Sequence, residues 1–349
     1  MKEDSEPSHG VGNSQCTEPQ STPQPGPTME THNVQPVIPD CDCGFTHAQD
    51  SNATVPLRLR RGGSLARTLY RKTVADNELR HMNKAVWYQT RLAGCSAAVR
   101  DCFVRMDCDE ETEAFLADAE AKSESILLQL WYSLVKLLLG WFFTQTSLNG
   151  FLGRGSMFVF SAAQFGRLLD GHVGRPGGRL LDIGAGDGAV TVRIESYFDQ
   201  VSVTEISAPM RRILARRKYR ILEIDNWADD GPWDVISCLN VLDRCSRPTD
   251  LLRQIHETLT PGGRAVIALV LPYQPYVEVG ENHEPEERMP IQGSSFDEQV
   301  ESFIAHVLDP VGFLVDKWTR LPYLCEGDLN QAYYWLSDAV FVVRKAEGL

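Results

Sequence analysis

The chain has few positive charges for its length. Its 349 residues include 34 Lys and Arg against 47 Asp and Glu, which gives a formal net charge of -13. A nucleic-acid backbone or an anionic membrane attracts a basic surface, so this balance disfavours both as the main partner. A small molecule, or a basic or neutral polypeptide, suits the charge better.

The cysteines do not form a disulfide pattern. There are 9, an odd number, in apolar contexts such as Cys238 and polar ones such as Cys108. A disulfide framework would show paired cysteines in a small secreted domain, so we expect a reducing compartment. Cys41 and Cys43 have no second Cys or His pair at zinc-finger spacing, which favours loop cysteines, and we predict no metal.

The amino-terminal region lacks large apolar residues. The opening "MKEDSEPSHGVGNSQ" has no apolar core of a secretory signal, so we expect a cytoplasmic or nuclear protein. Residues 1–56 are rich in Pro, Ser, Gln, Thr and Glu, a composition that predicts a disordered polar tail.

Helix breakers are missing from the next part of the chain. No Gly or Pro occurs between Ser96 and Leu139, and the pattern from 77 to 146 is helical. The apolar run 125–143 is interrupted by polar residues, which favours a helix packed on the protein over a membrane span. We predict a helical extension over residues 57–150, packed on a catalytic domain of residues 151–349.

Short apolar runs alternate with helical segments after residue 150. The runs expected as strands are 179–184, 201–206, 219–224, 233–239 and 263–271, and the helical patterns between them are 188–198, 208–217 and 248–259. This alternation predicts an α/β fold with a parallel sheet. Two further strands, 312–323 and 338–345, fit a closing hairpin at the sheet edge. The expected fold is a doubly wound, seven-stranded, Rossmann-like sheet.

The first of these strands ends in a glycine-rich turn, "LLDIGAGDGAVT". It contains Asp182, Gly184, Gly186 and Gly188 in the arrangement D-x-G-x-G-x-G. Glycines in a strand-to-helix turn let the backbone approach a ligand closely. An ordinary tight turn with incidental glycines is the alternative interpretation.

The next two strand ends sharpen the prediction. Glu205 ends the second strand, where a doubly wound fold places the acid that binds ribose hydroxyls. Asp225, Asn226 and Trp227 follow the third, and are suited to an adenine ring. The turn offers no Lys or Arg for a phosphate, which favours S-adenosylmethionine over a dinucleotide.

With these residues in view, the sequence resembles the class I methyltransferases. More narrowly, it resembles the DREV or methyltransferase-like 9 family of protein-histidine methyltransferases. The matching pieces are "TSLNGFLGRGSMFVFS", "LLDIGAGDG", "VTEIS", "DVISCLNVLDRC", "IALVLPYQPYVE" and "TRLPYLCEGD". The resemblance implies a methyltransferase sheet and S-adenosyl-L-methionine as cofactor, with S-adenosyl-L-homocysteine as product. It also implies methylation of the pros nitrogen of histidine in His-x-His motifs of proteins.

The fourth strand ends in Asn240 and, three residues later, Asp243. In the methyltransferase arrangement this strand end lies next to the transferred methyl group. We hypothesise that Asp243 accepts the N–H of the tele nitrogen, which fixes the tautomer that exposes the pros lone pair. Asn240 would supply a positioning hydrogen bond to the acceptor and touch the cofactor. Alternatively, Asn240 ends the strand and Asp243 caps the following helix.

Further candidates lie in two segments of the second half and in the stretch before the first strand. Arg154 is expected to bind the methionine carboxylate of the cofactor. The residues expected to bind the second histidine of the motif are Tyr273, Tyr276, Glu278, Arg320 and Glu326, with Tyr323 among the catalytic residues. Plain packing is the alternative for the tyrosines.

Two other functions compete with protein-histidine methylation. One is a small-molecule methyltransferase with the same cofactor crevice, and the other is a cofactor-binding scaffold without catalysis. A scaffold would show a damaged glycine turn or lack the acid of the second strand, and this chain keeps both. We expect a monomer that acts on His-x-His proteins or peptides, without nucleic acid or stable membrane insertion.

Overall fold

The computed structural model describes residues 64–139, 152–170, 178–277 and 282–346. By its contacts the chain divides into residues 1–36 and 37–349, and only the second part contains described residues. The predicted tail therefore lies outside the described residues, and so does Glu278.

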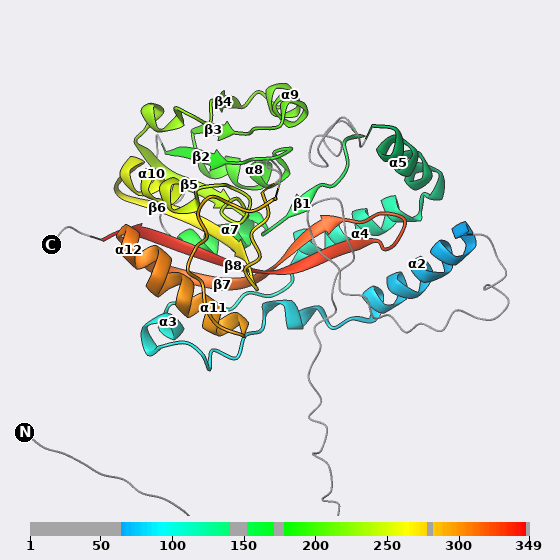
Figure 1. Cartoon of the computed structure of the whole chain (residues 1–349), viewed down its shortest axis with the longest axis horizontal. Helices are drawn as coiled ribbons and strands as arrows, with labels where there is room; N and C mark the ends of the chain where they lie inside the picture. Colours follow the sequence, from blue (N-terminus) through cyan, green and yellow to red (C-terminus); the bar gives the residue numbers. More distant parts are fainter. Residues whose placement is uncertain (1–63, 140–151, 171–177, 278–281, 347–349) are drawn as a thin grey trace, which may run out of the picture. The chain divides into compact units, whose positions relative to one another are not determined.

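One sheet organises the described chain, in the order β1-β7-β8-β6-β5-β2-β3-β4 (Figure 1). Strands β2 to β6 are parallel, whereas β8 is antiparallel to β6 and β7, and β1 is antiparallel to β7. The strands are β1 (Met157–Phe158), β2 (Arg179–Ile183), β3 (Gln200–Thr204), β4 (Arg220–Leu222), β5 (Trp233–Leu239), β6 (Leu259–Val270), β7 (Phe313–Glu326) and β8 (Tyr333–Lys345).

The predicted α/β fold class is confirmed, and seven of the strands are those read from the sequence. Two details differ. The closing hairpin does not lie wholly at the edge, because β8 is inserted between β6 and β7. Most of β8 is buried, which suits a central strand covered on both faces. The eighth strand, β1, is only a two-residue pairing, too short to leave a pattern in the sequence.

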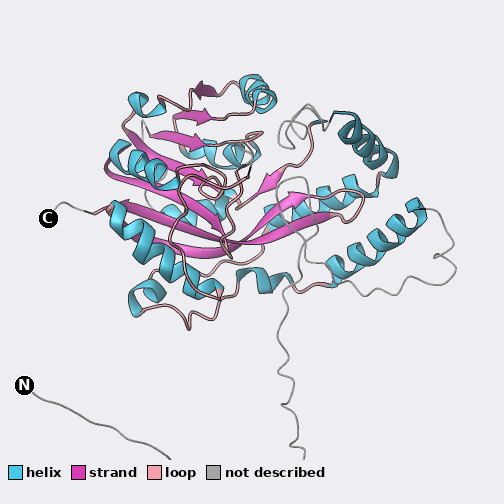
Figure 2. Cartoon of the chain, viewed as in Figure 1, coloured by secondary structure: helices cyan, strands magenta, loops and turns pink. Residues whose placement is uncertain are grey.

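Helices flank the sheet (Figure 2) and bury one apolar cluster on each face. Phe165 of α7 and Ile194 of α8 belong to one cluster, and Leu252 of α10 and Phe303 of α11 to the other. The helices are α2 (Ser64–His81), η1 (Lys84–Tyr88), α3 (Ala97–Asp101), α4 (Glu110–Glu124), α5 (Ile126–Leu139), α7 (Ala162–Leu169), α8 (Ala189–Ile194), η2 (Glu195–Tyr197), α9 (Ala208–Arg216), η3 (Trp227–Asp230), α10 (Pro248–Thr258), α11 (Phe296–Phe303), η4 (Ile304–Leu308) and α12 (Asp309–Val311).

The helical prediction for residues 77–146 is interrupted in the structure. Asp109 begins α4 by accepting from the backbone N–H of Thr112, as an N-cap does. Before it, Phe103 pairs with Trp318 of β7. Capping residues and this pairing outweigh helix propensity between α3 and α4, so the absence of Gly and Pro was an incomplete guide.

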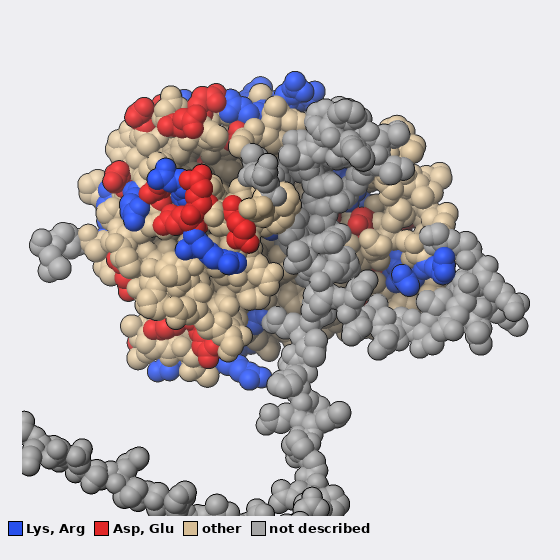
Figure 3. All heavy atoms as spheres, viewed as in Figure 1, with Lys and Arg blue, Asp and Glu red and all other residues tan. Residues whose placement is uncertain are grey.

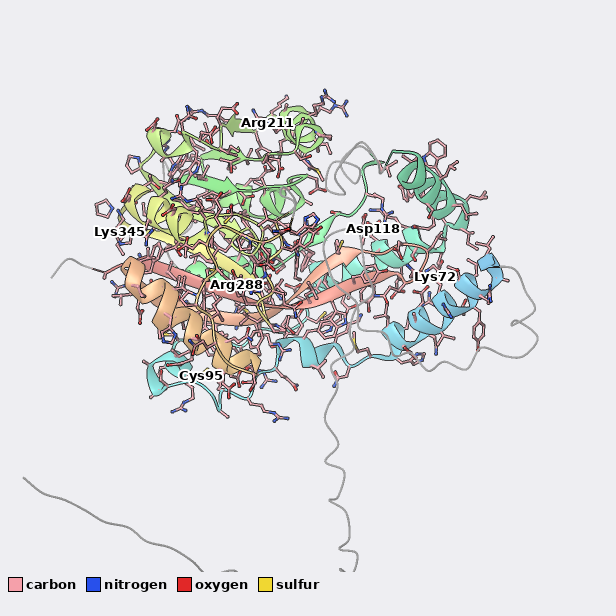
Figure 4. All side chains as sticks on the ribbon, in the orientation of Figure 1. Lys72, Cys95, Asp118, Arg211, Arg288 and Lys345 are labelled. Carbon is pink, nitrogen blue, oxygen red and sulfur yellow. The ribbon has the colours of Figure 1, made fainter. Side chains whose placement is uncertain are left out.

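The amino-terminal helices pack on each other through a buried lysine. Lys72 of α2, labelled in Figure 4, contacts Asp76 and Ser123, and Ser123 belongs to α4. The following helix, α5, has 14 residues. In the ranges that the structure describes, no helix is both long and apolar enough to cross a membrane.

Candidate functional site

The glycine turn links β2 to α8 at the carboxyl edge of the parallel strands. Gly184, Gly186 and Gly188 have φ values of +69°, +58° and +77°, the left-handed region that favours glycine. A Cβ on Gly184 would lie 2.7 Å from Val241, whereas one on Gly186 would meet nothing within 4 Å among the atoms present. Gly184 is therefore required by packing, and Gly186 leaves the open space where a ligand can approach the backbone.

Glu205, directly after β3, holds this turn in place. Its Oε2 accepts from the Gly186 backbone N–H (2.9 Å) and its Oε1 from that of Ser207 (2.7 Å). Glu205 is buried, and Arg211 donates to its carbonyl oxygen at 3.3 Å. Arg211 lies on α9 (Figure 4), where basic side chains gather at the top of the molecule in Figure 3. The predicted acid of the second strand thus lies beside the turn.

Asp225 and Asn226 follow β4 and are exposed at the same edge of the sheet. Trp227, in contrast, is 3% exposed and belongs to an apolar core cluster. Its ring therefore serves packing and does not offer a free face to an adenine.

Asp182 lies beneath the turn and braces it. Its Oδ2 accepts from the Thr191 hydroxyl of α8 (2.6 Å), and its Oδ1 accepts from the Ser237 hydroxyl of β5 (2.7 Å). The pKa of Asp182 is raised from 3.8 to about 6, because burial outweighs the two hydrogen bonds from hydroxyl groups, which lower it. Its direct contact with a cofactor stays a prediction.

This pKa predicts a pH-dependent stability. Because the pKa is higher in the folded state, the stability linked to Asp182 is complete below 3.8 and is lost as pH rises through about 6. Relative to the wild type, Asp182→Asn should therefore be more stable at pH 8 than at pH 4, by up to roughly 3 kcal/mol. Urea unfolding at the two pH values measures the difference, with the exposed Asp229→Asn as control. A pH-independent difference would contradict this assignment.

Asn240, after β5, has an unusual backbone and a buried amide. Its φ of +56° is left-handed, a conformation that Asn tolerates better than most residues. Its backbone N–H donates to Ala268 of β6 at 3.0 Å. Its Nδ2 donates to Asp338 Oδ2 at 2.8 Å, while its Oδ1 is buried and has no hydrogen-bond partner in the described chain.

Asp243 is 3% exposed, and its Oδ1 likewise meets no donor among the described residues. Arg244 Nε lies 3.4 Å from its Oδ2. Burial raises the pKa of Asp243, and the positive charge of Arg244 lowers it. The structure shows no helix at Asp243, since α10 begins at Pro248. The alternative role as a helix cap is therefore not supported.

Asp338 of β8 completes this group, and it was not among the residues predicted from the sequence. It is fully buried, and its Oδ1 has no hydrogen-bond donor in the parts of the chain described. Burial raises its pKa well above 3.8, and the charge of Asp243 adds to that effect. A carboxylate at the start of the apolar run "DAVFVV" was the available signal, but there it was the first residue of the expected strand 338–345, whereas β8 begins at Tyr333.

The predicted tyrosines lie around these acids. Tyr323 is 8% exposed, and burial raises its pKa. The charges of Cys325, Asp338 and Asp243 contribute to the same effect. Burial raises the pKa of Tyr273 to about 12, with a contribution from Asp243. The Tyr276 backbone N–H donates to the Asp243 carbonyl oxygen at 2.8 Å. The structure thus brings all three close to Asp243.

Two predicted residues, Arg320 and Glu326, lie apart from this group. Arg320 donates to the carbonyl of Gln89 and to Ser337, on the opposite face of the β7–β8 hairpin from Asp338, since neighbouring strand positions alternate. Glu326 accepts from the backbone N–H of Gly155 and Ser156 at 3.0 and 3.3 Å. Lys122 pairs with the same carboxylate.

Arg154 lies in this same loop before β1. Its Nη2 donates to the Gly327 carbonyl at 3.1 Å, and its guanidinium lies 5.1 Å from the centre of the Tyr132 ring. These contacts tie the loop to the end of β7. The roles of Arg154, Arg320 and Glu326 in ligand binding stay predictions.

The arrangement fits a nucleoside cofactor followed by an acceptor rich in N–H donors. The open space at Gly186 and the acid of Glu205 are suited to the cofactor, and Asp243, Asn240 and Asp338 present buried oxygen acceptors beyond it. Within the described ranges, no group of three His, Cys, Asp or Glu residues is arranged to hold a metal.

A family model described as DREV methyltransferase matches residues 87–345, more than half of the chain. Among curated proteins, dTDP-4-amino-2,3,4,6-tetradeoxy-D-glucose N,N-dimethyltransferase from Saccharopolyspora spinosa is 35% identical over 96 residues. That match covers 25% of this chain and 39% of the relative, so less than half of the relative's length is spanned.

Two solved structures are similar in part. A TehB-like SAM-dependent methyltransferase from Corynebacterium glutamicum is 21% identical, with 51% of this chain and 85% of that chain covered and a TM-score of 0.34. The YcgJ protein from Bacillus subtilis is 14% identical, with 54% and 98% covered and a TM-score of 0.36. Because both TM-scores are below 0.5, we assign the fold from the strand order and the family match.

Proposed function

Because the chain belongs to the DREV methyltransferase family, we propose that it methylates the pros nitrogen of histidine in His-x-His motifs of proteins. The match over residues 87–345 confirms the predicted family, and with it S-adenosylmethionine as the cofactor. The histidine acceptor is the further step, and one observation carries it. Buried oxygen acceptors, above all Asp243, gather at the end of β5 beside the glycine turn.

When bound, S-adenosylmethionine supplies an electrophilic methyl group, and the electrons of the broken C–S bond remain on sulfur. The glycine turn and Glu205 are suited to hold it, with Asp225 and Asn226 at the adenine end. Asp182 acts from below by keeping β2, β5 and α8 in register under the turn.

Asp243 suits an imidazole acceptor because it can select the reactive tautomer. An imidazole is mostly neutral at pH 7, with one N–H and one lone pair. If Asp243 accepts the tele N–H, the lone pair lies on the pros nitrogen and faces the methyl group. The ring becomes positive as the new N–C bond forms, and the Asp243 carboxylate stabilises that charge. The tele proton then passes to the carboxylate and on to water.

The test is transfer of labelled methyl from S-adenosylmethionine to a peptide with alternating histidines. We expect label on the pros nitrogen, identified by NMR of the product. Two control peptides, each with one histidine replaced by Ala, should both lose the label, because the motif requires both rings. Absence of labelling while the cofactor still binds would contradict the proposal.

A small-molecule N-methyltransferase is the second candidate, favoured by the sugar N,N-dimethyltransferase relative. The same acceptor oxygens would suit an amino group. Labelling of an amino-sugar nucleotide, but not of the peptide, would favour this function.

A further inference from the structure

The contact between Asp338 and Asn240 joins two distant parts of the chain. Asp338 lies on β8, paired with Val270 of β6 and Leu321 of β7, and Asn240 follows β5. Their bond, 2.8 Å from Nδ2 to Oδ2, is buried: Asp338 is fully enclosed and Asn240 half-buried. Such a buried polar contact is stronger than one in water, and it is costly to leave unmade.

This bond determines which way the Asn240 carboxamide faces. A carboxamide has a donor end and an acceptor end, and a half-turn about its last bond exchanges them. The donor end, Nδ2, donates to Asp338 Oδ2. The acceptor end, Oδ1, is then left buried without a hydrogen-bond partner among the described residues. With Asp338 ionised, a half-turn would bring this oxygen against a carboxylate oxygen that has no proton to donate, so the orientation is held.

We propose that Asp338 is a positioning residue, which fixes the carboxamide of Asn240 so that its oxygen accepts a hydrogen bond from an N–H of the bound acceptor peptide. The inference rests on the proposed function, since it needs an acceptor that carries N–H donors. Asp243 takes the tele N–H of the ring, and Asn240 takes a second donor of the same peptide. Two acceptors at fixed places orient the ring better than one.

Neighbouring contacts agree with this role. The backbone of Asn240 is held at φ +56° and by its bond to Ala268, so the side chain starts from a fixed position. Asn240 contacts Asp338 at 2.8 Å and lies three residues before Asp243, and the charge of Asp243 contributes to raising the pKa of Asp338. In the described structure, Asp338 Oδ1 has no hydrogen-bond partner, as expected for a carboxyl group at a ligand-binding position.

The kinetic test uses Asp338→Leu, which replaces the acceptor by an apolar side chain that can be buried in the strand. We expect kcat/KM for the peptide to fall about 10- to 100-fold, since misplacement of a positioning group has effects of this size. The Kd for S-adenosylmethionine should change less than threefold. Asp338→Asn keeps an oxygen that can accept from Asn240, so it should retain most of the activity.

A double-variant cycle separates positioning from plain structural support. In an Asn240→Ala background, Asp338→Leu should have little further effect on kcat/KM, because its partner is already missing. Equal losses in both backgrounds would overturn the proposal. So would full activity of Asp338→Leu in the wild-type background. Thermal unfolding of each variant reports whether it folds.

A second readout does not depend on the substrate. The side-chain NH₂ resonances of Asn240 are assigned by their loss in Asn240→Ala. In Asp338→Leu the bonded proton should shift upfield, because its hydrogen bond is lost. An unchanged resonance would overturn the proposal even if peptide methylation is confirmed. If the wild-type protein leaves the peptide unlabelled, but Asp338→Leu shows this shift, only the proposed acceptor is contradicted.

Discussion

Replacement of Asp243 by Asn is expected to lower kcat for peptide methylation by about 10²- to 10⁴-fold, the usual range for a lost acid–base or charge-stabilising group. The carboxamide keeps the size of the side chain but lacks the charge that stabilises the developing imidazolium. Single-turnover transfer of labelled methyl measures the effect directly. Because the variant residue can still accept the tele N–H, the loss should fall mainly on kcat and less on KM.

The control for this prediction is the affinity of the variant for the cofactor. Asp243 lies beyond the glycine turn, so the Kd for S-adenosylmethionine should stay within about threefold of the wild type, well under the loss in rate. Parallel loss of cofactor binding and turnover would show that Asp243 serves structure instead.

A change in pH dependence should accompany the loss of rate. Burial raises the pKa of Asp243, so activity in the wild type should fall as pH drops through that raised value, and the variant should lack this titration.

Gly186→Asn is expected to weaken binding of S-adenosylmethionine by at least about 100-fold, equivalent to roughly 3 kcal/mol. The backbone at Gly186 is left-handed, and a Cβ there would meet nothing within 4 Å in the protein. Asn accepts that conformation with little strain, so the fold should survive. Its side chain would occupy the space in which we place the cofactor. Isothermal titration calorimetry measures the Kd.

Gly262→Asn is the matched control. Gly262 has a φ of +80°, and a Cβ there also meets nothing within 4 Å. It lies near the start of β6, at the opposite edge of the sheet from the turn, because β6 runs parallel to β5. The same substitution there should leave the Kd unchanged. If both variants lost binding to the same degree, backbone strain and not occupancy of the space would be the cause.

The sequence predicted the sheet well because each strand is a short apolar run between helical segments. Such runs depend on local amino-acid composition, which can be read directly from the sequence. The insertion of β8 between β6 and β7 was not predicted, since strand order depends on which edges meet in space. The interruption of the helical region between α3 and α4 was also missed, because caps such as Asp109 outweigh propensity there.

The site was predictable where its residues follow strands directly. Glu205, Asn240 and Asp243 lie at one sheet edge because parallel strands end together. Asp338 was missed because β8 is antiparallel to β6. The first half of β8, and not its carboxyl end, therefore lies at the edge where the parallel strands end. Arg320 is harder to place from the sequence, since only its pairing with β8 reveals which face of β7 it occupies, and its role in ligand binding stays a prediction.

The central position of β8 has a consequence for the newly made chain on the ribosome. β6 and β7 are synthesised before β8, yet β8 must enter between them. Until residues 333–345 have emerged, both strands keep open edges of the kind that pair with other chains. Asp338 arrives on the same strand, so a nascent chain gains its closed sheet and its complete site in one step. A half-made chain should therefore depend on chaperones, and it should hold no partial activity.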